Sequence, residues 1–438
     1  MKIELHGKIT QELKELYKKM DAQGKLPSRK QLDQYYETFH RRFGPDVLSN
    51  LDGEVLLETV HGRGNQNSLV YWLEFKNDEE FPAIFGSIAG GSALKFGIYH
   101  RKETETWMTG SPQNQLELSI EEAVQIARKH RDQLIHGCEL LENMPSGGSD
   151  EDYRILQEEM DREAPNVSST AWGHKYYSLL YPNKLDDFHV EYFQRFHLIK
   201  LLQLPPDGVG RYLAAVRYVA IATELDIPIK HLTTLLNDRN GRPHRYWRVL
   251  VNYPDQPGFK NNWEAMRNGG YVAIGWEKLG DLSIVDFNQD SKNQVRSLMK
   301  TNYSDKGSWA DEIFNFVAGM QEGDLVLAFE RSTVLGIGRI TSPYQYDTSI
   351  PQIPHHHPVE WLSIGQWGLP AEEAKGRAIK ELRLPENLVE IEKHLLNPQP
   401  LPPIAPVIPL IPKLTGTPGR IQSVLDRKKQ AILYGPPG

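Results

Sequence analysis

The chain has 438 residues, enough for roughly two to four domains that each bury a core of their own. Hydrophobic residues make up 39% and charged residues 24%, as is usual for folded proteins in water, and no apolar run approaches the ~20 residues of a membrane helix. The net charge of −7 argues against a protein that coats nucleic acid over its whole surface. A single cysteine, Cys138, excludes an internal disulfide framework and fits a reducing cytoplasm, where we expect the protein to act.

Residues 1–146 are predicted to form an α+β module. Apolar side chains at helical spacing favour two helices within residues 8–43. Strands are expected at residues 68–75, 83–88, 90–99 and 105–108. A long helix is expected from Ser119 to Leu141, since Ser119 and Glu122 have the spacing of a capping box.

One pattern in this module leaves an enzymatic alternative open. Glu74-x-Lys76 on a predicted strand is similar to the Glu-x-Lys core of restriction nucleases, and Asp52 or Glu54 could supply the upstream acidic ligand for a metal. A lone Glu-x-Lys is common on strands, so an ordinary structural role is the simpler interpretation, and we assign no catalytic residue.

Residues 150–240 are predicted to form a helical domain. Gly147–Asp150 has the composition of a linker, and dense aromatic residues at helical spacing follow it. His174, His189 and His197 lie in this segment, but no cysteine or close carboxylate completes a ligand set. We therefore expect no metal here.

The segment 243–396 carries the residues on which a function can be based. Strands are expected at residues 246–252, 324–329, 334–340 and 358–361, followed by a charged helix over 371–396. Five tryptophans in a short span exceed what a small β-barrel needs for its core, and tryptophans near a surface can stack on a nucleobase. Their positions are Trp247, Trp263, Trp276, Trp309 and Trp361.

Basic residues gather at the start of the same segment. They can contact the phosphates of a nucleic acid, or belong to a solvated loop. The candidate phosphate contacts are Arg242, Arg245, Arg248 and Lys260. The run His355–His357 suggests a metal, but adjacent side chains on an extended strand alternate sides and cannot all face one ion. We prefer a structural role or a phosphate contact for it.

The order of these strands, with Gly275-Trp276, Gly336-Ile-Gly338 and Pro358-Val-Glu-Trp361, resembles the EVE/YTH-like superfamily of PUA-like open β-barrels. The resemblance implies a reader of modified bases, in which an aromatic cage encloses a flipped methylated base. Trp276 and Trp361 occupy matching positions, and Asn252 or Asn262 could read the base edge. Further candidates for the cage are Trp263, Trp309, Phe329, Tyr344 and Tyr346.

The carboxyl-terminal residues suggest a second unit. Residues 397–413 read as a proline-rich linker with a semi-rigid polyproline conformation, and residues 414–438 as the start of an AAA+ domain. A predicted strand runs into Gly435-Pro436-Pro437-Gly438, which looks like the first half of a Walker A loop. The lysine and Ser/Thr of a complete loop do not follow, so we expect no cofactor in these residues and read them as part of a longer ATPase.

A modified-base reader joined by a proline linker to an AAA+ motor resembles the McrB-type subunits of type IV, modification-dependent restriction and anti-phage defence systems. The resemblance implies methylated double-stranded DNA as ligand, a hexameric ring that hydrolyses ATP or GTP with Mg²⁺, and a separate McrC-type nuclease as partner. Two alternatives remain: an EVE/YTH-like module that binds RNA or acts as a scaffold, and a nuclease-like N-terminal domain that cleaves DNA directly.

Overall fold

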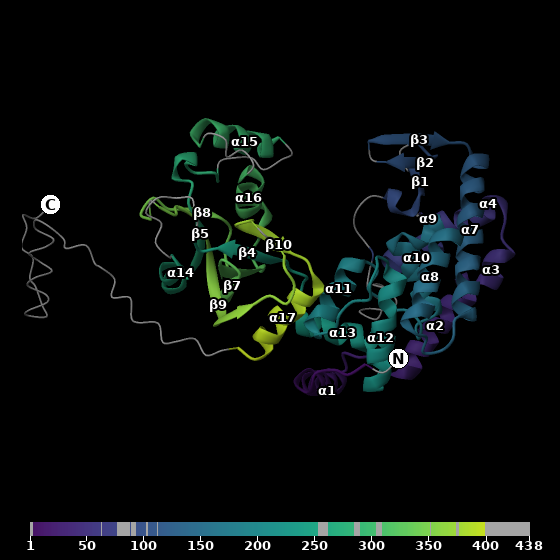
Figure 1. The fold of residues 1–438 in the computed structure, drawn as a ribbon. Coiled ribbons are helices and arrows are strands. Elements are labelled where there is room, and N and C mark those ends of the chain that lie inside the picture. Colours follow the sequence, from purple (N-terminus) through teal and green to yellow (C-terminus); the bar gives the residue numbers. More distant parts are fainter. Residues whose placement is uncertain are drawn as a thin grey trace, which may run out of the picture.

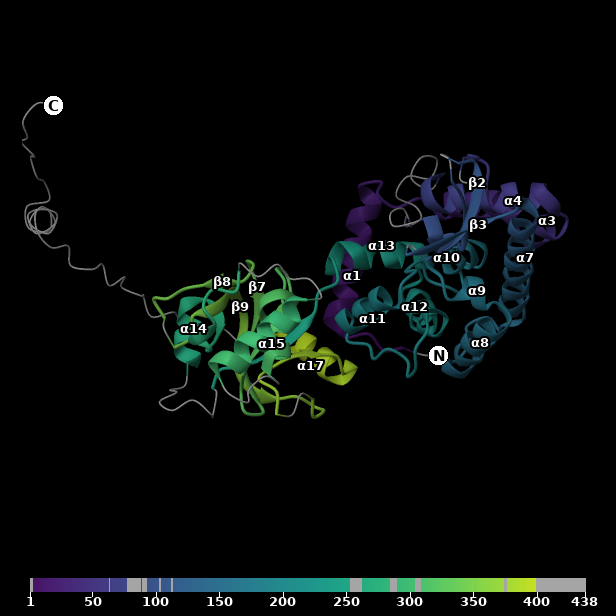
Figure 2. The same cartoon turned by 90° about the horizontal axis from the view of Figure 1, so that it is seen from above.

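The computed structural model describes residues 3–398, apart from the short segments 63, 77–87, 89–92, 102–103, 112, 253–261, 284–289, 304–308, 351 and 374–375. Two lobes lie side by side: a helical lobe (residues 3–240) and a sheet lobe (residues 244–398) (Figures 1 and 2). The predicted strand at 83–88, apart from Ile88, lies outside the described residues. So do the linker after residue 398 and the whole predicted start of an AAA+ domain.

The helical lobe is built from helices and one small sheet. Its helices are α1 (Gly7–Ala22), α2 (Arg29–Phe43), α3 (Pro45–Ser49), α4 (Gly53–His61), α5 (Leu69–Tyr71) continued by η1 (Trp72–Lys76), η2 (Ala93–Phe96), α7 (Ile120–Asn143), α8 (Asp150–Glu163), α9 (Pro165–Ser168), α10 (Ala171–Leu180), α11 (Glu191–Lys200), α12 (Arg211–Leu225) and α13 (Ile229–Asn240). The strands β1 (Ile98–Arg101), β2 (Thr106–Ser111) and β3 (Asn114–Leu118) form an antiparallel sheet.

Local signals placed several of these elements correctly. The two helices within residues 8–43 and the helical segment 150–240 are confirmed, as is the long helix with its Ser119–Glu122 capping box. The strand expected at 68–75 is wrong: the Ser68 side chain accepts a hydrogen bond from the Tyr71 amide and caps a helix. Within the strand expected at 90–99, residues 90–92 lie outside the described part of the chain, Ala93–Phe96 form a helical turn, and a strand begins at Ile98.

A single hydrophobic core runs through the helical lobe from Ile3 to Leu236. Helix α10 lies at its centre, where the hydroxyl of Tyr176 donates to the Phe43 carbonyl (2.8 Å) and that of Tyr177 to the Gln133 carbonyl (2.9 Å). The boundary expected near residue 146 therefore separates two helices but not two cores.

The sheet lobe contains a curled, seven-stranded sheet with the order β10-β4-β6-β7-β9-β5, in which β8 also pairs with β9. The strands are β4 (Tyr246–Leu250), β5 (Tyr271–Ile274), β6 (Leu325–Glu330), β7 (Thr333–Ile340), β8 (Gln345–Tyr346), β9 (His355–Gly368) and β10 (Ile379–Leu382). The helices are α14 (Trp263–Gly269), η3 (Glu277–Leu279), α15 (Ser291–Asn302), α16 (Ala310–Phe314) with η5 (Asn315–Gly319), and α17 (Pro385–Leu396). Strand β4 is parallel to β6, and the other pairs are antiparallel.

Most strands expected here are confirmed, but the helix over 371–396 is partly wrong. Residues Ile379–Leu382 form β10 at the sheet edge, paired with β4, and only Pro385–Leu396 is helical. Glu312 of α16 fixes this edge because its carboxylate accepts the amides of Ala378 and Ile379 (2.8 and 2.9 Å). That partner is 66 residues away in the sequence, so local charge patterning could not reveal it.

The two faces of the sheet bury different side chains. Val249, Val326 and Ala328 belong to an inner core shared with α15 and α16. Tyr246 and Leu327 belong to an outer core covered by α17. The large side chains of this lobe are thus divided between two separate environments.

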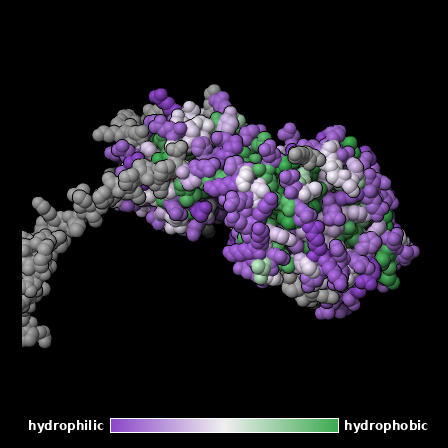
Figure 3. Space-filling model, turned by 90° about the horizontal axis from the view of Figure 1, so that it is seen from below, coloured by the Kyte–Doolittle hydropathy of each residue, from purple (hydrophilic) through white to green (hydrophobic). Residues whose placement is uncertain are grey.

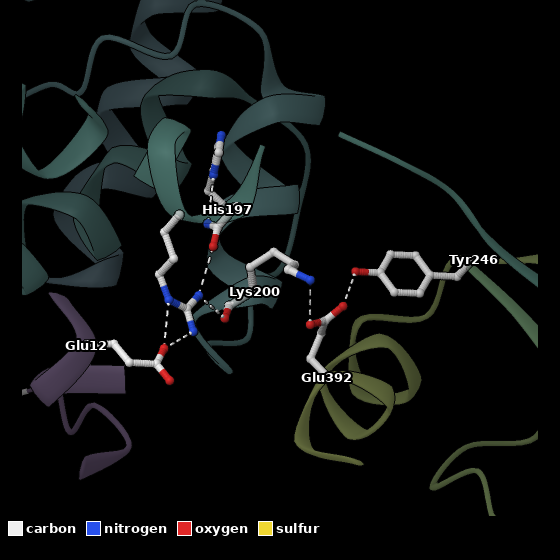
Figure 4. A network of polar contacts seen from close by, with 7 residues as sticks. Glu12, His197, Lys200, Tyr246 and Glu392 are labelled. Atoms are coloured by element: carbon white, nitrogen blue, oxygen red, sulfur yellow. Dashed lines mark hydrogen bonds and ion pairs between the residues drawn. The ribbon is translucent and has the colours of Figure 1, made fainter. Parts of the chain in front are cut away.

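A polar network joins the lobes beside this outer core (Figure 4). Glu392 of α17 pairs with Lys200 of α11 (Oε2 to Nζ, 2.7 Å) and accepts the hydroxyl of Tyr246 (2.8 Å). Lys8 of α1 donates to the Leu396 carbonyl at the end of α17 (2.6 Å). On the helical side, Arg239 donates hydrogen bonds to Glu12, to the Lys200 carbonyl and to the side chain of Asn240. The Asn240 side-chain amide is in turn hydrogen-bonded to His197 Nδ1.

Candidate nucleic-acid interface

Trp276 anchors an aromatic cluster at the end of β5. Its ring lies perpendicular to that of Tyr303 (centroids 4.9 Å apart) and 5.5 Å from that of Trp309. Its backbone has φ +73°, a left-handed conformation that costs a residue with a Cβ about 1–2 kcal/mol. Backbone strain of this kind is concentrated at sites that bind ligands, and the indole itself is 4% exposed.

His355 holds Trp276 in this conformation. The Tyr344 hydroxyl donates to His355 Nδ1 (2.7 Å), and His355 Nε2 donates to the Trp276 carbonyl (3.2 Å). Burial lowers the pKa of His355 to about 4, so the ring is neutral and keeps one donor and one acceptor. Tyr346 packs on the same imidazole, with ring centroids 5.1 Å apart. Four of the predicted cage residues, at positions 276, 309, 344 and 346, are thus brought together around this relay.

The run His355–His357 has a structural role in the strand. His357 Nε2 donates to the Phe316 carbonyl (2.6 Å), whereas His356 packs against Tyr271 on the opposite side. Among the residues that the structure describes, no three His, Cys, Asp or Glu side chains are grouped to hold a metal ion.

Trp263 and Trp361 form a second aromatic pair. Their rings meet edge to face at 4.8 Å, against the Gly336 and Gly338 positions of β7. A Cβ at Gly336 would lie 2.6 Å from the Trp263 ring, so the glycine is needed for this close approach. On β9, Trp361 lies six residues after His355, which contacts Trp276. Trp361 therefore packs with Trp263 and not with Trp276, its predicted partner in the cage.

The two predicted base-edge readers have unsatisfied amides. Asn252 Nδ2 donates to Glu330 Oε1 (2.9 Å), but its Oδ1 is buried and has no hydrogen-bond partner in the part of the chain that the structure describes. The same holds for Asn262 Nδ2. The Trp263 ring lies over Gly336 of β7, and Gly336 pairs with Ala328 of β6. Glu330, the partner of Asn252, is two residues further along β6. Asn252 therefore approaches the same end of the β6–β7 hairpin as Trp263.

Two predicted residues lie on the wrong face for such a site. Phe329 belongs to the outer core, where the Arg248 guanidinium stacks over its ring at 4.6 Å. Arg248 is buried and donates to the carbonyls of Arg331 (2.6 Å) and Glu373 (3.2 Å), so it does not present its charge to a phosphate. Neither residue can act as predicted in this arrangement.

The remaining basic candidates also lie away from the asparagines. Arg242 and Arg245 are exposed at the amino end of β4, and Arg245 donates to the Gly319 carbonyl (3.2 Å). Asn252 lies seven residues beyond Arg245, about 23 Å along an extended chain. Lys260 and Gly435–Gly438 lie outside the described residues.

The acidic residues of the alternative nuclease site are engaged in other contacts. Asp52 caps α4 and forms a two-pronged pair with Arg128 (2.6 and 3.1 Å), which holds the pKa of Asp52 below its usual value. Glu74 lies on a helix, not a strand, and its Oε1 accepts the ammonium of Lys95 (2.8 Å). These contacts do not favour a nuclease centre.

No helix in the described part of the chain is long and apolar enough to cross a membrane. A sequence model of a family described as a domain of unknown function (DUF8426) matches residues 248–380, from β4 to β10 of the sheet lobe. No curated protein matches the chain.

Proposed function

We propose that the sheet lobe binds nucleic acid carrying a modified base, which is flipped into a pocket between its aromatic residues, as in EVE/YTH-like readers. The curled sheet, the strained Trp276 and the Trp263–Trp361 pair support this proposal. Methylated double-stranded DNA is the preferred ligand, and RNA is the alternative.

One observation carries the proposal: Asn252 and Asn262 bury an acceptor and a donor that have no hydrogen-bond partner among the described residues. A buried polar atom without a hydrogen bond costs about 1–3 kcal/mol, so such atoms are rare unless a ligand or water satisfies them. The Watson–Crick edge of a base offers a donor and an acceptor side by side. Each of the two amide atoms could therefore pair with one group on a base edge.

The aromatic rings would supply most of the binding energy. Removing a base from its stack costs a few kcal/mol, and stacking on an aromatic side chain returns about 1–3 kcal/mol per base. A methyl group on the base adds apolar area, worth about 0.8 kcal/mol when buried. A modified base would be favoured because aromatic rings around it would exclude water from that methyl group.

The proposed role of the whole protein is DNA recognition in an McrB-type restriction or defence ATPase. The reader would deliver modified DNA to an AAA+ ring that hydrolyses ATP or GTP with Mg²⁺, and an McrC-type nuclease would cleave it. This wider assignment depends on the sequence resemblance of residues 397–438.

Titration of the protein with matched duplexes tests the proposal. The duplexes contain either unmodified bases, N6-methyladenine or 5-methylcytosine, and RNA of the same sequence is a further competitor. We expect the protein to prefer one modified duplex. Asn252→Ala and Trp276→Gly should each weaken that preference by about 1–3 kcal/mol, and glycine suits the left-handed backbone at position 276.

Trp367→Ala is the matched control, because this indole stacks on His394 of α17 at the outer face (4.0 Å). It should leave the preference unchanged. Equal affinity for all duplexes, or full discrimination by the folded Trp276→Gly protein, would refute the base-reader proposal. A preference for RNA would replace DNA as the ligand.

A further inference from the structure

A cavity of about 580 Å³ lies at the junction of the two lobes, apart from the proposed base pocket. Helix α11 forms one wall, and the start of β4 with the β10–α17 connection forms the other. Small-molecule sites commonly have volumes of about 300–1,000 Å³ and occur at domain interfaces. Hydrophobic side chains are interspersed with hydrophilic ones across the surface that Figure 3 displays.

Aromatic side chains from both lobes line this interlobe cavity. The rings of Phe196 and Tyr246 lie 5.0 and 5.2 Å from that of His244. Tyr192 is half exposed, and its hydroxyl donates to the His244 carbonyl (3.3 Å). An exposed tyrosine beside a row of rings provides a flat surface on which a planar ligand can stack.

The charged lining of the cavity comprises Arg195, Arg245, Arg383 and one carboxylate, Glu381. Arg195 also pairs with Glu191 of α11 (Nη1 to Oε1, 3.6 Å), so the arginines exceed the carboxylates around the cavity by one. The side chain of Arg383 is 75% exposed although it pairs with Glu381 (2.6 Å). Burial lowers the pKa of His244 to about 3, so the arginines alone supply the positive charge. A guanidinium has five donors in a fork that fits two phosphate oxygens.

The floor of the cavity is held in place by the polar network between the lobes (Figure 4). The Tyr246 hydroxyl donates to Glu392, which pairs in turn with Lys200 of α11. Both walls are thereby fixed to one buried carboxylate. The two walls are thus held together before a ligand enters, so binding does not have to bring them together.

We propose that the interlobe cavity binds a nucleotide, with the base stacked on Tyr192 and the phosphate held by the arginines. Two sources share this chemistry: a free mononucleotide and the 5′-terminal nucleotide of a strand. The site does not depend on the modified-base reader, because Arg245 and Asn252 lie at opposite ends of β4. It also differs from the Walker-like residues 435–438.

Isothermal titration of the full chain tests this site with AMP, adenosine and inorganic phosphate. We expect AMP to bind at least about tenfold more tightly than adenosine or phosphate, since only AMP can use both the rings and the arginines. Arg383→Ala and Tyr192→Ala should each weaken AMP binding by about tenfold. Oligonucleotides with and without a 5′-phosphate distinguish the two sources of the ligand.

Two control variants complete the design. Arg41→Ala removes an arginine that is 70% exposed on α2, outside the cavity, and should not change AMP binding. Trp276→Gly should also leave it unchanged, so failure of the base reader is distinguishable from failure of this site. Undetectable AMP binding at millimolar concentration, or equal binding by the wild-type, Arg383→Ala and Tyr192→Ala proteins, overturns the proposal.

Discussion

Glu392→Gln should loosen the junction between the two lobes. The glutamine keeps the shape of the side chain and an acceptor for Tyr246, but it removes the charge that faces Lys200 across 2.7 Å. The Glu392 side chain is only 6% exposed and that of Lys200 only 16%, so the ammonium would remain in a site poor in water. The substitution therefore isolates the effect of charge.

The expected loss can be bounded from this burial. Removing one partner of a fully buried ion pair costs about 3–5 kcal/mol, because the other charge stays desolvated. Lys200 retains some access to solvent and a flexible stem, which lowers the expected cost to about 2–3 kcal/mol. Tyr246→Phe removes one hydrogen bond to a charged acceptor and should cost about 1.5–3 kcal/mol.

Urea unfolding combined with hydrogen exchange in α11 and α17 measures this effect on both sides of the junction. The double variant Lys200→Met/Glu392→Gln should recover part of the loss, since no unpaired charge remains. Glu37→Gln on the surface of α2, where Glu37 and Arg41 are 3.9 Å apart and largely exposed, should change nothing measurable. If Glu392→Gln behaves like Glu37→Gln, the pair does not hold the lobes together.

Three further predictions follow from the burial and backbone geometry of single residues. Burial lowers the pKa of His174 to about 3, so only the unfolded chain binds this proton as pH falls below 6.5. The free energy of unfolding should therefore fall by about 2 kcal/mol from this residue between pH 7 and 5. In His174→Gln, the midpoint of urea unfolding should depend less on pH across that range. Gly338→Ala places a Cβ 2.1 Å from Val359 Cγ1 and should cost about 1–3 kcal/mol by overpacking, whereas Gly323→Ala, which meets no atom within 4 Å, should show only the strain of its positive φ in the same melts. At Trp276, the glycine variant should be about 1 kcal/mol more stable than the alanine variant because φ is +73°, and equal melting temperatures would contradict the strain there.

The elements that sequence predicts well are those whose signals are local. The capping box at Ser119 and the strands of the 324–340 hairpin are specified by neighbouring residues in the sequence, and both are confirmed. The run at 68–75 has strand composition, but Ser68 caps a helix whose residues are buried on several sides. Residues 379–382 become a strand only because β4 offers an edge and Glu312 binds their amides.

The site could be predicted only in part for a related reason. Trp276, Trp309, Tyr344 and Tyr346 share one neighbourhood, as a functional cluster should. Strand β6 is apolar on both faces, so its alternation did not indicate that Phe329 faces the outer core. Tyr303 stands alone in a polar stretch, and only the fold brings it against Trp276. The pairing of Arg248 with backbone carbonyls likewise has no sequence signature.

The end of α17, in the sheet lobe, is tied to the helical lobe at two points, through Lys8 at the Leu396 carbonyl and through Lys200 at Glu392. Tension applied to the chain at residue 398 would therefore not peel away α17 alone. It would load α1 and α11 at the same time, because both helices are bonded to α17. The junction is thus where mechanical work done on the following chain could change the angle between the lobes without unfolding either of them.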